Sequence, residues 1–243
     1  MWLREGKMDN SSMNDVIVSE SCAVTLLGGG KVNLKDLREA LRLAPSLVAA
    51  DGGATFAMEN GFAPVAVIGD MDSIPVRIRA DVPVGRFHEV SDQDSTDFDK
   101  ALRNIDAPLI LGVGFLGRRV DHQLANFNVL ARRFDRRCIL VGKHDVVFAA
   151  PCELELPLAP LSRVSLFPMA PVSGRSRGLN WEIDGLDMTP NGVIGTSNHV
   201  RAGHGGPVSL AFDRPGMLVI VPRASLNLAI SALERATPFS PAR

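Results

Sequence analysis

The sequence predicts an α/β fold in which a largely parallel sheet domain is followed by a mostly antiparallel β domain. Between Cys22 and about Ala150, short apolar runs alternate with segments of helical period, a pattern typical of βαβ units. After Pro151, proline and glycine become frequent, and short apolar runs separated by turns indicate antiparallel strands. The 243 residues, 46% of them hydrophobic, suffice for two domains. The expected division is a disordered tail over 1–20, an α/β domain over 21–150, a β domain over 151–223 and a helical C-terminal tail over 224–243.

The first domain opens with a strand in AVTLLGGG, and the helix NLKDLREALRLAP follows with Asn33 as its N-cap. Further strands are expected in SLVAADGGA, VAVIGD, RFHEV, PLILGVG and RCILVG. STDFDKALRNI and VDHQLANFNVLARRF have helical period. The second of these helices is expected to present one apolar face, formed by Val120, Leu124, Phe127, Ala131 and Phe134.

In the second domain, strands are expected in RVSLFP, GVIGTSN, PVSLAF and MLVIVPR. The closing segment SLNLAISALERA places Leu226, Ile230 and Leu233 on one face of a helix.

Charge and hydropathy exclude several classes of protein. The formal net charge is -1, so no basic excess points to a nucleic-acid partner. The first twenty residues lack the apolar stretch of a signal peptide, and no run reaches the roughly 18 apolar residues of a membrane helix. We therefore expect a cytoplasmic protein with no membrane partner.

Polar clusters follow four strands of the first domain, at 28–30, 51–53, 69–73 and 112–121. In an open α/β sheet, ligands bind beyond the carboxyl ends of the strands. We therefore expect the four clusters to converge on one site.

Carboxylates crowd these strand ends, in VIGDMDSI and again in DQDSTDFDK. Two like charges about 4 Å apart cost roughly 1 kcal/mol in water and about 4 kcal/mol near a protein surface, so such a group requires cations. Mg²⁺ fits because it binds carboxylates together with substrate phosphates. Lys100 and Arg119 offer further compensation. The acidic residues concerned are Asp51, Asp70, Asp72, Asp97 and Asp121.

Simpler interpretations exist for each feature alone. Aspartate is common after strands as a turn former or helix cap. The glycine clusters match neither GxGxxG nor the P-loop pattern, and isolated glycines form turns. His122 is a ligand, an acid or base, or a hydrogen-bonded residue of a first helical turn. For Trp181, the simpler interpretation is a core residue.

Several segments resemble the thiamine pyrophosphokinase family. In order these are AADGGA, VIGDMDSI, DQDSTDFDKAL, GFLGRRVDHQLANFNVL, SLFP, GLNW and TSN, which span most of the chain. The resemblance implies ATP-dependent transfer of a diphosphoryl group to the hydroxyl of thiamine, which gives thiamine diphosphate and AMP. It also implies a Rossmann-like nucleotide-binding domain, a C-terminal β-sandwich, and a homodimer with its active sites at the subunit interface.

The resemblance assigns roles residue by residue. Asp70, Asp72 and Asp97 match the Mg²⁺-binding aspartates of the family. The implied catalytic set is Asp51, Asp70, Asp72, Asp97, Lys100, Arg119 and Asp121. The implied nucleotide-binding set is Gly29, Gly52, Gly53, Gln93, Thr96, Lys100, Gly117, Arg119, His122 and Asn126. On the thiamine side it implies Trp181, Ser197 and Asn198, and an indole face suits the cationic thiazolium.

The chain departs from the family at two positions. Arg118 stands where a second glycine is usual before the arginine, and Gly195 stands where many members have serine. The expected mechanism is in-line attack of the thiamine hydroxyl at the β-phosphorus, with Asp51 or Asp121 as the base. The alternatives are a diphosphokinase for another alcohol such as a pterin, a metal-dependent phosphohydrolase, and a non-catalytic nucleotide-binding module.

Overall fold

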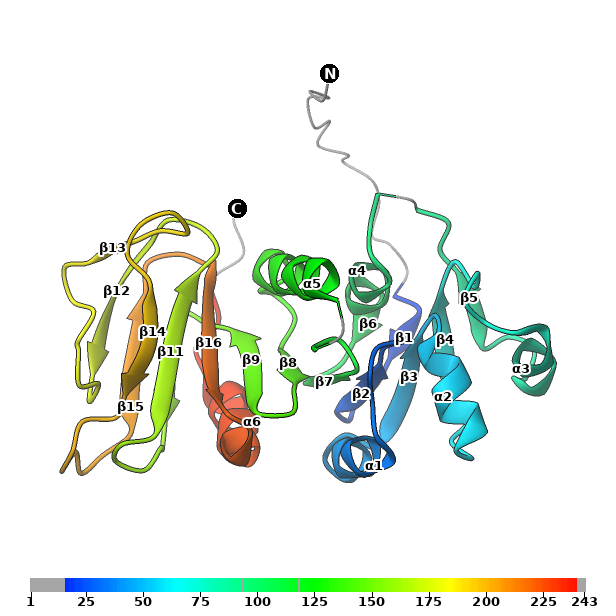
Figure 1. Ribbon diagram of the computed structural model, residues 1–243, viewed down its shortest axis with the longest axis horizontal. Helices are drawn as coiled ribbons and strands as arrows, with labels where there is room; N and C mark the ends of the chain where they lie inside the picture. Colours follow the sequence, from blue (N-terminus) through cyan, green and yellow to red (C-terminus); the bar gives the residue numbers. More distant parts are fainter. Residues whose placement is uncertain (1–15, 93, 118, 240–243) are drawn as a thin grey trace, which may run out of the picture.

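A ten-stranded mixed sheet runs through the whole molecule (Figure 1). The computed structural model describes residues 16–92, 94–117 and 119–239. The strand order is β14-β11-β16-β9-β8-β7-β2-β3-β4-β5, and every pair from β8 to β5 is parallel. The parallel strands are β2 (Val24–Leu27), β3 (Ser46–Ala50), β4 (Ala66–Gly69), β5 (Phe87–Glu89), β7 (Ile110–Val113) and β8 (Cys138–Val141). The expected strands of the first region are therefore confirmed.

The other half of this sheet is antiparallel. It consists of β9 (Asp145–Ala149), β16 (Met217–Pro222), β11 (Arg163–Pro168) and β14 (Gly195–His199). β9 pairs with both β8 and β16, so backbone hydrogen bonding continues across the expected domain boundary after residue 150.

A separate antiparallel sheet has the order β10-β15-β12-β13. Its strands are β10 (Glu153–Leu156), β15 (Val208–Phe212), β12 (Val172–Arg177) and β13 (Asp187–Met188). Leu154 and Leu210 of this sheet share one hydrophobic core with Val164 and Val219 of the long sheet. The sequence patterns missed β9, β10, β12 and β13.

Helices cover both faces of the parallel strands. Successive residues of β2 point to opposite faces, so Leu27 packs with α1 while Leu26 packs with α4 and α5. The predicted N-cap Asn33 is confirmed, since its Oδ1 accepts a hydrogen bond from the Asp36 N–H at 2.8 Å. The helices are α1 (Leu34–Leu43), α2 (Gly53–Glu59), α3 (Val76–Asp81), α4 (Asp97–Arg103), α5 (Val120–Arg132) and α6 (Leu226–Arg235).

The face of α5 that packs on the sheet matches the predicted one only in part, since Phe127 and Ala131 pack against the core as partly buried residues. Its buried residues are Asn126, Val129 and Leu130, while Val120 and Leu124 are 77% and 59% exposed. The first turns of α5 stand beyond the strand ends, beside the cavity described below, so only the later turns reach the core. The spacing of apolar residues alone could not distinguish the predicted face of α5 from the face that is buried.

The chain ends also differ in part from expectation. β1 (Val18–Ser19) lies within the expected tail over 1–20, yet it pairs in parallel with β6 (Ile105–Asp106) and buries Val18. Residues 1–15 lie outside the described residues. At the other end, Leu226 and Leu233 are buried on α6 as predicted. No helix in the described part of the chain is long and apolar enough to cross a membrane.

Candidate active site

An open cavity of about 700 Å³ lies at the carboxyl ends of the parallel strands, beside the N-termini of α4 and α5. Its position matches the expectation for an open α/β sheet. Glycine-rich loops after β2 and β3 form one wall and the two helices form another. The predicted residues that line it are Gly29, Asp51, Gly52, Asp70, Thr96, Asp97, Lys100, Arg119, His122 and Asn126.

The glycines of this wall allow backbone segments to approach one another. A Cβ on Gly30 would overlap the carbonyl oxygen of Gly114, and a Cβ on Gly53 would overlap that of Leu27. Gly53 does not line the cavity, so its observed contact is with the sheet. Gly29 and Gly52, in contrast, present backbone directly to the cavity.

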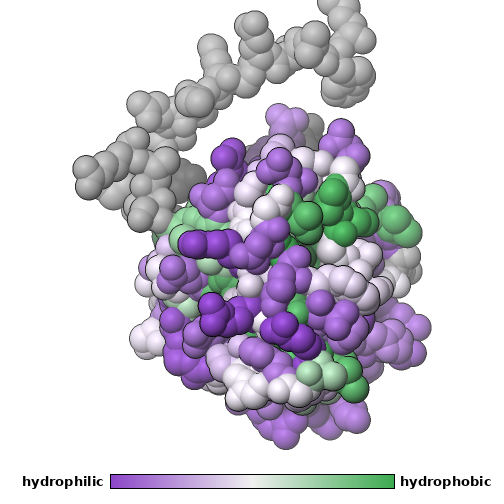
Figure 2. Space-filling model, turned by 90° about the vertical axis from the view of Figure 1, so that its left-hand side faces the viewer, coloured by the Kyte–Doolittle hydropathy of each residue, from purple (hydrophilic) through white to green (hydrophobic). Residues whose placement is uncertain are grey.

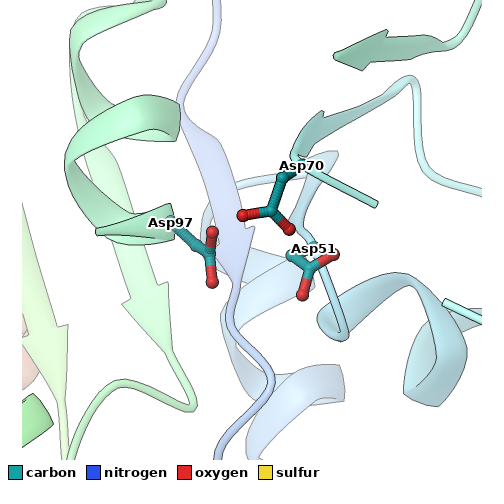
Figure 3. A group of neighbouring side chains, drawn as sticks. All are labelled: Asp51, Asp70 and Asp97. Atoms are coloured by element: carbon teal, nitrogen blue, oxygen red, sulfur yellow. The ribbon is translucent and has the colours of Figure 1, made fainter. Parts of the chain in front are cut away.

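Three carboxylates meet at the bottom of this site (Figure 3). Asp51, Asp70 and Asp97 each offer an oxygen within 4.8 Å of the other two. Asp51 follows β3 in a left-handed conformation with φ of +40° and is only 4% exposed. Among the described residues, its buried Oδ1 has no hydrogen-bond partner. A non-glycine residue held at positive φ, with an unpartnered buried oxygen, is a feature that clusters at functional sites.

Lys100 is the cation beside these carboxylates. Its Nζ lies 2.9 Å from Asp70 Oδ2 and 3.6 Å from Asp97 Oδ1, and its side chain is 3% exposed. Asp97 and Lys100 stand one helical turn apart on α4, so the helix directs both at the cavity. Thr96 caps that helix, because its Oγ1 accepts a hydrogen bond from the Asp99 N–H at 3.2 Å.

The electrostatics of the group are uneven. Burial raises the pKa of Asp97, and the negative charge of Asp51 raises it further. The hydrogen bond from Lys100 lowers the pKa of Asp70. One lysine therefore does not compensate all three carboxylates, and an all-oxygen donor set of this kind fits a hard divalent cation such as Mg²⁺.

Some predicted residues lie outside this group. Asp72 is exposed and does not line the cavity, although its N–H donates to Asp70 Oδ1 at 3.3 Å. Asp121 is 2.6 Å from Arg119, and both side chains are more than 60% exposed. Gly117 donates its N–H to Gln123 Oε1 at 3.0 Å and also does not line the cavity. Gln93 and Arg118 lie outside the described residues.

Other lining residues were not named as site residues, although Ser73 and Phe115 fall within the polar clusters 69–73 and 112–121 that were expected to converge. Ser73 and Ser95 line the cavity, and each follows an aspartate in one of the two acidic runs, which was an available signal. Phe115 also lines it and packs on Phe98 with ring centroids 4.6 Å apart. No sequence pattern indicated that contact.

The second group of predicted residues lies around β14. Asn198 is buried and brackets the backbone of Trp181, donating to its carbonyl at 2.7 Å and accepting from its N–H at 3.3 Å. The indole itself is 60% exposed and stands edge-on to His199 at 5.2 Å. The alternative that Trp181 is a core residue is therefore wrong. Ser197 is exposed and has φ of +60°.

The two groups are far apart in one chain. β14 ends the long sheet, and the strands β11, β16, β9, β8 and β7 separate it from β2. Six strand spacings of about 4.8 Å correspond to roughly 29 Å. Figure 1 shows β14 and the β2–β4 strands at opposite sides of the molecule.

These features define an α/β protein with a carboxylate and lysine pocket at the carboxyl ends of its parallel strands and a separate antiparallel sheet. Two family models match the chain. "Thiamin pyrophosphokinase, catalytic domain" matches residues 37–141, and "Thiamin pyrophosphokinase, vitamin B1 binding domain" matches residues 152–215. The chain belongs to the thiamin pyrophosphokinase family.

Curated relatives agree with this assignment. "Thiamine pyrophosphokinase 1" of Arabidopsis thaliana is 30% identical over 169 residues, which cover 60% of this chain and 61% of the relative. "Thiamine pyrophosphokinase 1" of Oryza sativa subsp. japonica is 31% identical over 160 residues, covering 58% and 60%. The match thus spans about three-fifths of the length of these relatives.

The thiamin pyrophosphokinase structure from Candida albicans has a TM-score of 0.66 at 15% identity, over 84% of this chain and 92% of that one. A protein from Lactobacillus plantarum also gives 0.66, at 24% identity, over 83% and 98%. At these identities the structures support the fold.

Proposed function

We propose that the protein is an ATP-dependent thiamine pyrophosphokinase, which transfers a diphosphoryl group from ATP to the hydroxyl of thiamine and releases AMP. The observation that carries the proposal is the group of Asp51, Asp70 and Asp97 around Lys100, beside glycine-rich backbone at the strand ends. Family membership supplies the identity of the acceptor. The match to a vitamin B1 binding domain model favours this function over a pterin diphosphokinase or a phosphohydrolase.

Mg²⁺ is the proposed metal, held by Asp70 and Asp97 with Asp51 beside them. Asp72 stays a predicted ligand on the basis of family resemblance. When bound, Mg²⁺ would neutralise charge on the phosphates of ATP and stabilise the charge that develops during transfer.

The chain's own groups have distinct proposed tasks. Lys100 presents a positive charge to the phosphates, and the backbone of Gly29 and Gly52 permits their close approach. Thr96, Arg119, His122 and Asn126 are further proposed contacts from the α4 and α5 side of the cavity. Catalysis would then consist mainly of positioning and electrostatic stabilisation of in-line attack.

Of the two candidate bases, Asp51 fits better than Asp121. Asp51 lines the cavity, and in the described part of the chain its buried Oδ1 has no hydrogen-bond partner, so its carboxylate is the proposed acceptor of the hydroxyl proton. Asp121 does not line it, and the hydrogen bond from Arg119 lowers the pKa of its carboxyl, which weakens it as a base.

On the thiamine side, the exposed indole of Trp181 offers a face to the thiazolium, an interaction of about 0.5–2 kcal/mol. Ser197 is a proposed polar contact of the pyrimidine. Asn198 is proposed to act beside it, and its two hydrogen bonds to Trp181 support a role in fixing the backbone beneath the indole.

We further propose a homodimer in which one chain supplies the carboxylate pocket and its partner supplies Trp181. The separation of roughly 29 Å in a single chain supports this, because thiamine cannot bridge it. Leu186, Val193 and Ile194, in the same part of the chain as Trp181 and β14, are at least 39% exposed. Figure 2, which views the end with β12 and β13, shows hydrophobic patches among hydrophilic side chains.

Three finer descriptions accompany the proposal. The α/β part is proposed to be Rossmann-like over 21–150, and the facing antiparallel sheets over 151–223 to form a β-sandwich. The protein is proposed to act in the cytoplasm.

The test is a product assay with ATP and Mg²⁺, with and without thiamine. Thiamine-dependent AMP and thiamine diphosphate are the expected products, and Asp97→Asn should abolish them while the neighbouring exposed variant Asp94→Asn keeps them. ADP would indicate ordinary phosphoryl transfer, and AMP without thiamine would indicate hydrolysis. Either result, or no turnover at all, would refute the proposed function.

A further inference from the structure

A second cavity, of about 780 Å³, lies on the separate β10-β15-β12 sheet beside the end of α6. None of the predicted site residues lines it. Its size falls within the range typical of small-molecule sites. The charged residues that line it are Glu153, Glu155, Arg175, Arg177, Asp184 and Arg235.

Strand register arranges four of these charges in two walls. Ala211 on the central strand β15 pairs with Glu153 on β10 and with Arg175 on β12. Paired residues in antiparallel strands point to the same face of the sheet. Across the three strands, this face therefore presents an acidic residue, a small residue and a basic residue: Glu153, Ala211 and Arg175. The next row on the same face has the same order and consists of Glu155, Ser209 and Arg177. We call this feature the β10–β12 groove.

The two walls do not neutralise each other. Strands β10 and β12 are two spacings apart, which is roughly 9.6 Å. Ala211 and Ser209 are too short to fill the space between them. Within residues 16–92, 94–117 and 119–239, no charged group of the groove forms an ion pair within 4.0 Å. The groove therefore presents opposite charges across an open floor.

The charge balance restricts the class of ligand. Three carboxylates and three guanidinium groups line the groove, so the lining has no net formal charge. The acidic wall would repel a polyanion, and the basic wall would repel a ligand with only positive charge. A ligand with both charges can satisfy both walls, with phosphate on the arginines, which bind it in a bidentate manner.

We propose that the β10–β12 groove binds a small dipolar ligand, with its phosphate on Arg175 and Arg177 and its cationic group on Glu153 and Glu155. Thiamine diphosphate has this chemistry. If the proposed function holds, the groove is a product-sensing site on a different sheet from the catalytic cavity. That identity of the ligand rests on the proposed function, while the dipolar class rests on the groove alone.

The experiment is a calorimetric titration of the full chain with thiamine diphosphate, compared across variants. Arg175→Gln combined with Arg177→Gln is expected to weaken one class of binding site at least tenfold. Arg214→Gln, an exposed arginine of the same region, is the matched control and should leave that class unchanged. Asp97→Asn should also leave it unchanged, which separates the groove from the catalytic cavity. All substituted arginines are exposed, so unchanged thermal melting is expected to confirm folding.

Three further probes test the class of ligand. Pyrophosphate and thiamine each carry one of the two charges and are expected to bind the groove at least tenfold more weakly than thiamine diphosphate. Phosphocholine carries both, so its binding to the groove would support the dipolar class independently of the proposed enzyme activity. Equal binding of thiamine diphosphate by wild type and the double arginine variant would overturn the proposal. Pyrophosphate binding as tightly as thiamine diphosphate would overturn the dipolar class.

Discussion

Asp99 on α4 is expected to be a major contributor to stability. Its side chain is 4% exposed, and it accepts hydrogen bonds from Arg132 Nη2 at 3.0 Å and from Arg133 Nε at 2.8 Å. The two arginines stand at the end of α5. The contact therefore joins the helix that carries Asp97 and Lys100 to the helix that carries His122 and Asn126.

The size of the effect follows from burial. A hydrogen bond to a charged group contributes about 1.5–3 kcal/mol, and an exposed ion pair about 0–1 kcal/mol. Arg133 is 32% exposed, so its hydrogen bond to Asp99 should contribute within the range of about 1.5–3 kcal/mol. Arg132 is 54% exposed, so its contact should contribute closer to about 0–1 kcal/mol. Asp99→Asn should lower the free energy of unfolding by about 3 kcal/mol at pH 7, which corresponds to a fall in Tm of roughly 6–12 °C.

The pH dependence has a definite sign. Burial alone would raise the pKa of Asp99, but the hydrogen bond and charge of Arg133, with the charge of Arg132, hold it below its usual value. Its stabilisation is therefore present above the unfolded-state pKa of about 3.9 and is lost as the pH falls through the folded-state value.

Urea unfolding of wild type and variant between pH 8 and about pH 2.5 is the assay, since the loss is expected below the unfolded-state pKa of about 3.9. The difference in free energy of unfolding between wild type and Asp99→Asn should stay constant down to about pH 5 and shrink below about pH 4. Asp135→Asn, which removes an exposed pair with Arg136, is the matched control and should change stability by less than about 0.5 kcal/mol. A loss below about 0.5 kcal/mol for Asp99→Asn at pH 7 would refute the reasoning.

Four further variants test the site and the fold. Asp97→Asn should stabilise the metal-free protein slightly, by up to about 1 kcal/mol, because burial and the negative charge of Asp51 raise the pKa of Asp97 and so disfavour its ionised form, while solvent screening of this half-exposed side chain keeps the effect small; activity should be lost, and lower stability would contradict this. Asp72→Asn should remove most activity, and near-normal turnover at saturating Mg²⁺ would reject Asp72 as a ligand. Arg223→Gln should lower the free energy of unfolding by about 1–3 kcal/mol, since the guanidinium of Arg223 bridges two carboxylates of α1. Thermal melting measures the effect, and an unchanged Tm would argue against that contribution. A 1:1 mixture of Asp97→Asn and Trp181→Ala chains, randomly reassembled from inactive parents, should regain about a quarter of wild-type activity if the site is shared, because half of the dimers are mixed and each has one intact site of two; no recovery would contradict a shared site.

The parallel half of the fold was predictable because its strands are continuous apolar runs between glycine-rich turns. The same is true of Asn33, whose capping role depends only on local sequence. The short edge strand β13 and the neighbouring β12, with SGR in its middle, carry no such pattern, so only tertiary pairing reveals them. The predicted face of α5 was only partly right for a related reason, because the position of the helix relative to the sheet decides which residues are buried.

The candidate site was predictable in composition and less so in geometry. Strand ends indicated which carboxylates would converge, and Asp51, Asp70 and Asp97 do so. Sequence alone placed Asp72 and Asp121 with them. The left-handed turn at Met71, with φ of +66°, and the local pair between Asp121 and Arg119 are three-dimensional features with no clear sequence signal. The β10–β12 groove depends on strand register, which the sequence patterns did not supply.

The proposed reaction transfers an intact diphosphoryl group, and labelled ATP reveals whether this group moves as one unit. ATP carrying radioactive phosphorus at the γ position is incubated with the protein, Mg²⁺ and thiamine, and the products are separated. The account predicts that all label consumed from ATP appears in thiamine diphosphate while AMP forms in equal amount. Label in inorganic phosphate or thiamine monophosphate, with ADP as the nucleotide product, would contradict it.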